Sequence, residues 1–322
     1  MQSAPREVLR SIVKKEEAGV RLDQFLASRF TYYSRSGWKK IIDQNKISVD
    51  QKIEKASCLV KEGDIVEYYS EISEEPPVRS DFILIYENPE FFAIDKPGDL
   101  PVHASGRYRK NNLVDLLATI SDRPYLVNRL DRETSGIVLF GKNPKISSEL
   151  SDYFANRKVK KIYLALVWGE FPISFRSYGF IGPDPSSSVR KKRKFYSASD
   201  PNLEMEKVGR SNGEWETCET KFRRIKTGIH QGKIYSKVLC LPKTGRLHQI
   251  RATLYSSGYP LLGDKLYGVD DRIFLEFIEG KNPDLFESLG MERQALHSLG
   301  LSFSHKGNRI RIRSNPPSDF PI

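Results

Sequence analysis

The spacing of apolar positions in the first part of the chain changes from a helical to an extended period. Apolar side chains recur every three or four positions in RLDQFLASRF (21–30), and again in SRSGWKKII (34–42) after Ser34, which suits a helix N-cap. KISVD (46–50) alternates like a short strand, and VKEGDIVEYY (60–69) is typical of a turn followed by another strand. The pattern therefore predicts two helices and a small curled sheet.

The remainder of the chain mixes both periods without a regular β-α-β order. This mixture favours an α+β fold with a mixed, mostly antiparallel sheet. Polar residues rich in Ser, Pro and Gly at 182–214 predict an insertion or a flexible arm. Helices are expected at 113–120, 146–159 and after Gly245, and strands at the start of 91–106 and at 161–170, 216–225, 233–240 and 309–314.

A seam between the two patterned regions lies at SEEPPVRS (73–80), where a diproline and acidic residues interrupt the pattern. We therefore expect an extension, a small domain, a linker and a large domain, at residues 1–18, 19–70, 71–80 and 81–322.

The balance of charge points to a polyanionic partner. The 322 residues carry a formal net charge of +11, which favours nucleic acid or an anionic membrane surface. No apolar run reaches the roughly 18–20 residues that span a bilayer, and the N-terminus MQSAPREVLRSIVKKEE does not resemble a secretory signal. We therefore expect nucleic acid as the partner, and no membrane.

The residues that usually hold metals or cofactors are scattered. Cys58, Cys218 and Cys240 show no C-x-x-C pairing, and the five histidines have no metal-ligand spacing. Neither a phosphate-binding P-loop nor a dinucleotide-binding glycine motif is present. The sequence therefore predicts a reducing cytoplasm, no cofactor and no metal. We also expect a monomer.

One carboxylate stands out in the stretch LVNRLDRETSGIVLF (126–140). Asp131 lies between Arg129 and Arg132, just before the apolar run that ends at Phe140. A guanidinium beside a carboxylate lowers its pKa from about 3.9 by roughly 1–3 units. These residues alone leave open whether Asp131 fixes a turn or is a reactive group kept ionised.

The small domain resembles the S-four type RNA-binding domain. The likeness covers roughly residues 19–69 and rests on RLDQFL, SRS, II, ISVD and VKEGDIV in that order. Asn45 stands where many relatives have glycine, and asparagine tolerates the positive φ of such a turn. The resemblance implies that basic residues near the second helix contact RNA phosphates; the alternative is a solvated face. These residues are Arg35, Lys39, Lys40 and Lys46.

The large domain is similar to the RluA-type family of RNA pseudouridine synthases. Four segments carry the likeness over about residues 81–315: AIDKPGDLPVH, NRLDRETSGIVLF, KKIYLALVWG and KTGRLHQIRATLYSSGYPLLGDKLYG. With the small domain in front, the architecture resembles the members that modify large-subunit ribosomal RNA. The resemblance implies that a uridine's N-glycosidic bond is broken, the uracil rotates, and a carbon–carbon bond to the ribose forms.

Matching the family motif assigns a role to each site residue. Asp131 matches the catalytic aspartate, which acts as nucleophile or as base. Arg251 matches its arginine partner, and Tyr163 matches the tyrosine on which a flipped-out base stacks. The alternatives are an ordinary salt bridge for Arg251 and a core side chain for Tyr163.

The expected substrate contacts rest on weaker matches. Lys161 and Arg246 are expected to serve phosphates or loop packing. Arg129 is expected to hold RNA or to fill the gap left by the flipped base. We expect His248 on one polar helical face with Arg251, as a substrate contact or as a bridge between helix and loop; the apolar face is expected to hold Leu247, Ile250 and Leu254.

Two features leave the substrate open. Asn128 stands where most relatives of this subtype have histidine, and RKKRK (190–194) is either a basic finger that grips RNA or a solvated loop. The two-domain architecture makes modification of large-subunit ribosomal RNA the leading hypothesis. The alternatives are the same reaction on tRNA, and a catalytically silent RNA-binding or ribosome-assembly protein.

Overall fold

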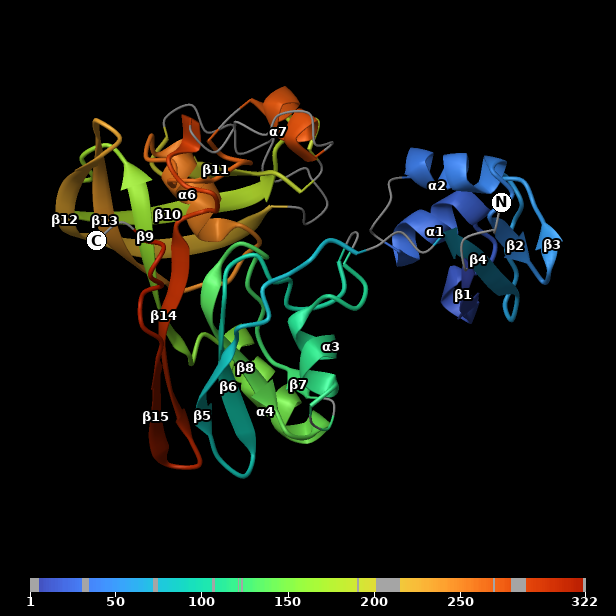
Figure 1. Cartoon of the computed structure of the whole chain (residues 1–322), viewed down its shortest axis with the longest axis horizontal. Helices are drawn as coiled ribbons and strands as arrows, with labels where there is room; N and C mark the ends of the chain where they lie inside the picture. Colours follow the sequence, from blue (N-terminus) through green and yellow to red (C-terminus); the bar gives the residue numbers. More distant parts are fainter. Residues whose placement is uncertain are drawn as a thin grey trace. The chain divides into compact units, whose positions relative to one another are not determined.

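The chain folds into two compact units, which are described separately (Figure 1). The computed structural model describes residues 6–30, 35–71, 75–105, 108–120, 122, 124–189, 191–200, 215–268, 270–278 and 288–320. The first unit comprises Met1–Pro77 and His103–Asn112, and the second comprises Val78–Val102 and Leu113–Ile322. No described helix is both long and apolar enough to cross a bilayer.

The first unit contains the two predicted helices and a four-stranded antiparallel sheet in the order β1-β4-β2-β3. Its core is built around Trp38, which is fully buried and donates its indole N–H to the Phe30 carbonyl at 3.1 Å. Asn45 has φ 58°, as expected for its turn, whereas the proposed cap Ser34 lies outside the described residues. The elements are β1 (Arg6–Ile12), η1 (Lys15–Glu17), α1 (Leu22–Arg29), α2 (Arg35–Asp43), β2 (Ile47–Val49), β3 (Lys52–Ile53) and β4 (Ile65–Glu71).

The boundaries of this unit differ from those expected. β1 belongs to the small sheet because it pairs with β4 along its whole length, so residues 1–18 are not merely an extension. Strand pairing between distant segments leaves no local sequence signal, which is why the spacing pattern missed it. Within the same unit, the Glu75 carboxylate accepts hydrogen bonds from the backbone N–H groups of Arg109, Lys110 and Asn111, at 2.8–3.0 Å.

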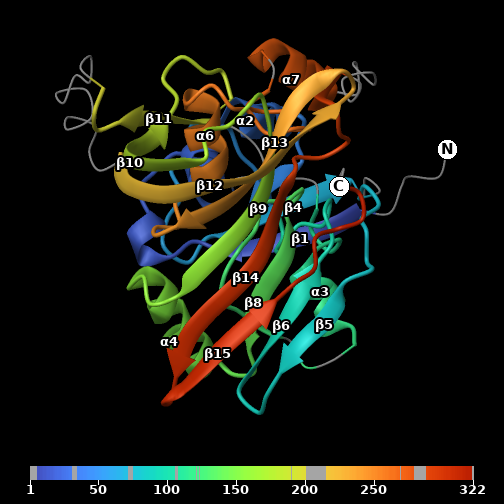
Figure 2. The same ribbon diagram turned by 90° about the vertical axis from the view of Figure 1, so that its left-hand side faces the viewer.

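The described strands of the second unit form an 11-stranded sheet that is mostly antiparallel (Figure 2). Its order is β11-β10-β12-β13-β9-β14-β8-β6-β5, with β15 paired to β14 and β7 paired to β8. The only parallel pair recorded for the described strands joins β14 to β8. The strands are β5 (Ile83–Glu87), β6 (Phe91–Lys96), β7 (Tyr125–Leu126), β8 (Ser135–Gly141), β9 (Lys160–Trp168), β10 (Ser174–Pro183), β11 (Arg193–Ser197), β12 (Glu216–His230), β13 (Lys233–Pro242), β14 (Leu296–His305) and β15 (Asn308–Arg313).

Short helices pack on this sheet. α4 packs along β7 and β8, and α6 packs against β10 and β11 (Figures 1 and 2). α4 begins as its sequence suggests, because the Asn143 side chain accepts a hydrogen bond from Ile146 N at 2.9 Å and Pro144 occupies the first turn. The helices are α3 (Leu113–Ala118), α4 (Pro144–Ala155), α6 (Gln249–Ser256) and α7 (Asp271–Ile278).

The close approach of β8 and β14 depends on one glycine. Gly136 has φ 106°, and a Cβ built there lies 2.3 Å from the Ser298 carbonyl oxygen. Only glycine fits this position without moving the backbone. The glycine of the TSG motif therefore sets where β8 begins, and with it the position of the loop that carries Asp131.

The segment 182–214 is not wholly an arm. Its first part continues β10 to Pro183, and Arg193–Ser197 return as β11, paired antiparallel with β10. Residues 201–214 lie outside the described part of the chain.

Candidate active site

An ion pair joins Asp131 to Arg251 in the second unit. Arg251 Nη1 donates to Asp131 Oδ2 at 2.8 Å, from the first turns of α6 to the loop before β8. Its other nitrogens bind Asp264, with Nε to Oδ2 and Nη2 to Oδ1 both at 2.8 Å. The side chains of Asp131, Arg251 and Asp264 are 28%, 9% and 0% exposed. One guanidinium thus bridges a fully buried carboxylate and a carboxylate that reaches solvent.

A tight turn holds the buried carboxylate. Gly263 has φ 71°, and a Cβ there lies 2.0 Å from the Arg293 carbonyl oxygen, so this turn requires glycine. The next residue, Asp264, accepts hydrogen bonds from Leu266 N at 3.0 Å and Tyr267 N at 3.1 Å. The GD of the GDKLYG motif is therefore the anchor that fixes the Arg251 side chain.

Burial and charge compete at Asp131. Burial raises the pKa of the carboxyl, but the charges of His248 and Arg251 outweigh burial and bring this pKa down to about 2. Burial also lowers the pKa of His248 to about 4, so this imidazole is neutral at pH 7. Arg251 is therefore the cation that keeps Asp131 ionised at neutral pH.

A second set of contacts holds the loop around Asp131. Gln294 Nε2 donates to Thr134 Oγ1 at 2.6 Å and lies 3.5 Å from Asp131 Oδ2. The Glu133 carboxylate accepts from Lys265 Nζ at 2.7 Å and from the backbone N–H of Gln294 at 3.1 Å. Glu133, the acidic neighbour of Asp131, is therefore occupied in tying the loop to the segment before β14.

Asn128, which replaces the usual histidine, has a structural contact. Its side-chain oxygen accepts from Leu139 N at 2.8 Å, and its amide nitrogen lies 3.4 Å from the Ile137 carbonyl. These bonds fasten the chain before Asp131 to β8. Asn128 thus supports the geometry of the loop.

Tyr163 lies on β9, where its backbone pairs with Cys240 of β13 and Ser298 of β14. Its half-buried ring packs against an apolar cluster that includes Ile250 and Leu254 of α6. Burial, with a smaller contribution from the charge of Asp131, raises the pKa of Tyr163 to about 12. Tyr163 is therefore a neutral aromatic side chain within the electrostatic reach of Asp131.

His248 differs from its predicted helical position. It is the residue that precedes α6, with φ 55° and ψ 20°, so it does not share a helical face with Arg251. Leu247, expected on the apolar face, is 42% exposed, whereas Ile250 and Leu254 are buried as predicted. The left-handed backbone instead directs the imidazole toward Tyr267 Oη, 3.0 Å from Nδ1, and toward Asp131 Oδ1, 4.0 Å from Nε2.

Lys161 and Arg246, two of the other predicted contacts, have partners within the protein. Lys161 is buried and donates to the Thr244 carbonyl at 2.7 Å, and burial together with the charge of Arg246 lowers its pKa to about 8. Arg246 pairs with Glu216. These contacts correspond to the loop-packing alternative. Arg129 is exposed on the loop that carries Asp131.

Where it is described, the RKKRK segment is part of the folded second unit, and its contact with RNA stays a prediction. Lys192 is buried and pairs with Asp271 of α7 at 2.7 Å, and Arg193 opens β11. Lys194 Nζ lies 5.0 Å from the centroid of the Tyr196 ring. Strand pairing and a buried ion pair therefore order residues that the charge pattern suggested were mobile.

The basic residues of the first unit differ in exposure. Lys39 and Lys40 on α2 are exposed, and Lys46 is half-buried. Arg35 Nε pairs with Asp23 at 2.8 Å, and Arg21 binds the same carboxylate. Lys39 and Lys40 are consequently the best placed of the four to meet a phosphate.

Four residues of the site were missed from the sequence: Asp264, Tyr267, Gln294 and Lys96. The Lys96 ammonium is fully buried and donates to the carbonyls of Pro97, Leu100 and Arg132, at 2.8, 2.9 and 3.0 Å. Lys96, Asp264 and Tyr267 all lie inside the motif segments quoted above. Their place in those segments was the only sequence signal that could have identified these three as site residues. Spacing within a motif does not reveal which distant residue a side chain contacts.

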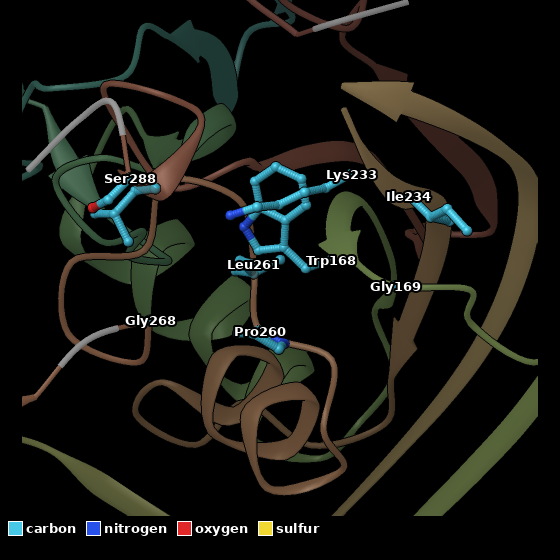
Figure 3. A pocket seen from close by; sticks show the side chains of 9 residues that line it. Trp168, Gly169, Lys233, Ile234, Pro260, Leu261, Gly268 and Ser288 are labelled. Atoms are coloured by element: carbon cyan, nitrogen blue, oxygen red, sulfur yellow. The ribbon is translucent and has the colours of Figure 1, made fainter. Parts of the chain in front are cut away.

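A hollow of about 400 Å³ lies elsewhere in the second unit (Figure 3). It is lined by Trp168, Lys233, Pro260 and Leu261 among others, and by none of the predicted site residues. The Lys233 ammonium lies 5.6 Å from the centroid of the Trp168 ring, so the lysine already covers that aromatic face. The hollow is therefore separate from the Asp131 site.

Comparisons with known proteins support this picture. The model of the family described as RNA pseudouridylate synthase matches residues 90–256, and the S4 domain model matches residues 20–66. The chain belongs to the RNA pseudouridylate synthase family. A solved structure, human RNA pseudouridylate synthase domain containing 1, shares the fold with a TM-score of 0.57 and 21% identity, over 75% of this chain and 86% of that one.

Two curated relatives of this chain are named for different substrates. The mitochondrial tRNA pseudouridine(32) synthase of Saccharomyces cerevisiae is 31% identical over 81% of this chain and 53% of its own length. Ribosomal large subunit pseudouridine synthase C of Buchnera aphidicola is 27% identical over 96% of this chain and 94% of its own length. This pseudouridylate synthase chain therefore spans about half of the yeast relative and nearly all of the Buchnera one.

Proposed function

We propose that this protein isomerises uridine to pseudouridine in RNA, with Asp131 as the catalytic carboxylate. The observation that carries the proposal is the Asp131–Arg251–Asp264 chain, which keeps one solvent-reaching carboxylate ionised at the edge of a buried network. Arg251 occupies Oδ2, and no hydrogen bond to Oδ1 is recorded among the described residues. Oδ1 is therefore the oxygen offered to the sugar.

The geometry suits a reaction that needs one ionised oxygen. In the isomerisation the N1–C1′ bond breaks, C5 bonds to C1′, the C5 proton leaves to solvent, and N1 is protonated. An ionised Oδ1 serves either as nucleophile at C1′ or as base on the ribose. Glycoside hydrolysis uses two carboxylates instead, and Glu133 is occupied by Lys265 and the Gln294 backbone.

Tyr163 supports binding of an extruded base. Its ring remains a neutral phenol at physiological pH, since its pKa is raised to about 12 by burial. Base–aromatic stacking contributes roughly 1–3 kcal/mol and tolerates any base. The platform would hold a uracil beside Asp131 without selecting it by hydrogen bonds.

Large-subunit ribosomal RNA is the substrate we favour. The Buchnera relative, which the chain matches almost from end to end, is named for the ribosomal large subunit, and this name supports the choice. The yeast relative is named for tRNA but is matched over only about half of its length, so tRNA is the second candidate. Pseudouridine mapping of ribosomal RNA and tRNA from cells with and without this protein separates the two: sites lost only from tRNA would contradict our choice.

Activity itself is tested by tritium release from RNA labelled at carbon five of uridine. Release should follow the formation of pseudouridine, since the C5 proton is lost in every turnover. No release from any cellular RNA pool would favour the silent RNA-binding alternative. We also propose that the protein is a monomer in a reducing cytoplasm, where its three cysteines would stay as thiols.

Replacing both Lys39 and Lys40 by alanine is expected to weaken RNA binding and its salt dependence. Each lysine–phosphate contact contributes about 0.7–0.9 to the slope of log K against log salt, so the slope should shrink by roughly 1.5. Binding isotherms at several salt concentrations measure it. The matched control replaces Lys52 and Lys55, also exposed in the same unit, and should leave the slope unchanged. Equal slopes for both double variants would refute the role of α2.

A further inference from the structure

The imidazole of His248 is held by the hydroxyl group of Tyr267, a residue to which the sequence analysis assigned no role. Its side chain is 9% exposed, and its left-handed backbone places Nδ1 3.0 Å from Tyr267 Oη. The two rings meet edge to face, with centroids 5.7 Å apart. The opposite nitrogen, Nε2, faces the Asp131 carboxylate.

The two partners of the Tyr267 hydroxyl determine which groups donate and which accept. The backbone N–H of Arg193, at the start of β11, donates to Tyr267 Oη at 2.9 Å. A peptide N–H can only donate, so Oη accepts there and its own hydrogen needs an acceptor. Among the described residues, His248 Nδ1 is the acceptor recorded at hydrogen-bond distance. A nearly buried hydroxyl seldom leaves its hydrogen unpaired, because that forfeits a hydrogen bond.

We propose that Tyr267 is a positioning residue that fixes His248 in the tautomer with a bare Nδ1 and a protonated Nε2. The N–H at Nε2 then points to Asp131 Oδ1, 4.0 Å away. This separation is too long for a direct hydrogen bond and leaves room for an oxygen of the substrate to approach both groups. His248 thus presents a neutral N–H donor beside the carboxylate.

The charges around His248 agree with a neutral donor. Burial and the cations Arg251 and Arg193 disfavour the imidazolium, while Asp131 and Asp264 favour it, and the pKa is lowered to about 4. The two guanidinium groups and the two carboxylates around His248 balance in formal charge, so burial, the largest cause, favours the neutral imidazole. A neutral donor adds a hydrogen bond for substrate without a second cation that would compete with Arg251 for Asp131.

Histidine ¹⁵N NMR of the full-length protein tests the tautomer directly. The His248 resonance is assigned by its loss in His248→Gln. In the wild type at pH 7 we expect an unprotonated Nδ1 shifted by hydrogen bonding and a protonated Nε2. In Tyr267→Phe, which keeps the ring against Arg251, the hydrogen-bond shift at Nδ1 should disappear. A protonated Nδ1 in the wild type, or unchanged shifts in Tyr267→Phe, would overturn the proposal.

A matched control is offered by Tyr255, which is 43% exposed and lies beside Tyr267, with ring centroids 5.9 Å apart. Tyr255→Phe should leave both His248 nitrogens unchanged. If it changes them as much as Tyr267→Phe does, the effect is general disturbance of packing and the proposal fails.

The consequence for turnover rests on the proposed function, whereas the tautomer does not. Loss of one neutral hydrogen bond should lower kcat of Tyr267→Phe about five- to ten-fold, with KM for RNA changed less than about two-fold. A larger effect on KM than on kcat would contradict a positioning role. If wild-type protein shows no turnover, the NMR result still stands, so failure of the two proposals can be told apart.

Discussion

Asp131→Asn is expected to abolish pseudouridine formation while leaving the fold and the RNA affinity intact. Asparagine keeps the shape of the side chain and an oxygen that can accept from Arg251 Nη1. It removes the ionised Oδ1, and loss of a nucleophile or base at the reacting centre typically costs at least about 10³-fold in rate. Single-turnover tritium release measures the loss, and RNA binding and thermal unfolding measure what is retained.

Asp99→Asn is the matched control. Asp99 is also an aspartate paired with an arginine, Arg132, at 3.2 Å, but its side chain is 50% exposed. Its φ of 62° suits asparagine equally well. Exposed ion pairs contribute about 0–1 kcal/mol, so stability and turnover should change little. Turnover that survives in Asp131→Asn, or an equal loss in the two variants, would show that Asp131 is not the catalytic group.

The elements that could be predicted are those whose pattern is local. The helical spacing that begins at Ile146 corresponds to α4, and the alternation of 216–225 and 233–240 corresponds to β12 and β13. Pairings between distant segments could not be predicted this way. The parallel contact of β14 with β8 and the pairing of β1 with β4 join segments far apart in the sequence, and nothing in either segment alone specifies its partner.

The site residues also divide into those that a local motif predicts and those whose role depends on a distant contact. Asp131 and Arg251 were matched to a motif, and they meet in space although 120 positions separate them. The part played by Asp264 was not predictable, because a single GD dipeptide says nothing about which guanidinium its carboxylate will bind. His248 was misplaced because its spacing from Arg251 fits a helix, whereas its left-handed backbone begins α6 one residue later.

Arg251→Met is expected to destabilise the protein strongly as well as inactivate it. Methionine preserves the apolar length of the side chain but leaves Asp264, which is fully buried, without its cation. Breaking a buried ion pair in this way costs about 3–5 kcal/mol. Urea unfolding at pH 7 measures the stability.

The pH dependence of stability shows whether the unpaired Asp264 carboxylate causes the instability of Arg251→Met. In the wild type, burial raises the pKa of Asp264 but Arg251 and two backbone N–H groups lower it overall, so its contribution to stability is present at neutral pH and is lost as the pH falls. Without Arg251, burial raises the folded-state pKa. The cost is then present at pH 7, fades as the pH falls through the raised folded-state pKa, and is gone below the unfolded value of about 3.9. The stability gap between variant and wild type should therefore narrow toward low pH.

Adding Asp264→Asn should restore most of the stability of Arg251→Met without restoring turnover. The asparagine oxygen can still accept from Leu266 N and Tyr267 N, and no buried charge remains unpaired. Asp131 stays without its guanidinium partner in the double variant, so burial raises the pKa of its carboxyl against weaker opposition and Oδ2 loses the bond that holds the carboxylate in place. Recovery of turnover along with stability would mean that Arg251 only holds the fold; equal instability of single and double variants would mean that the unpaired Asp264 charge is not the cause.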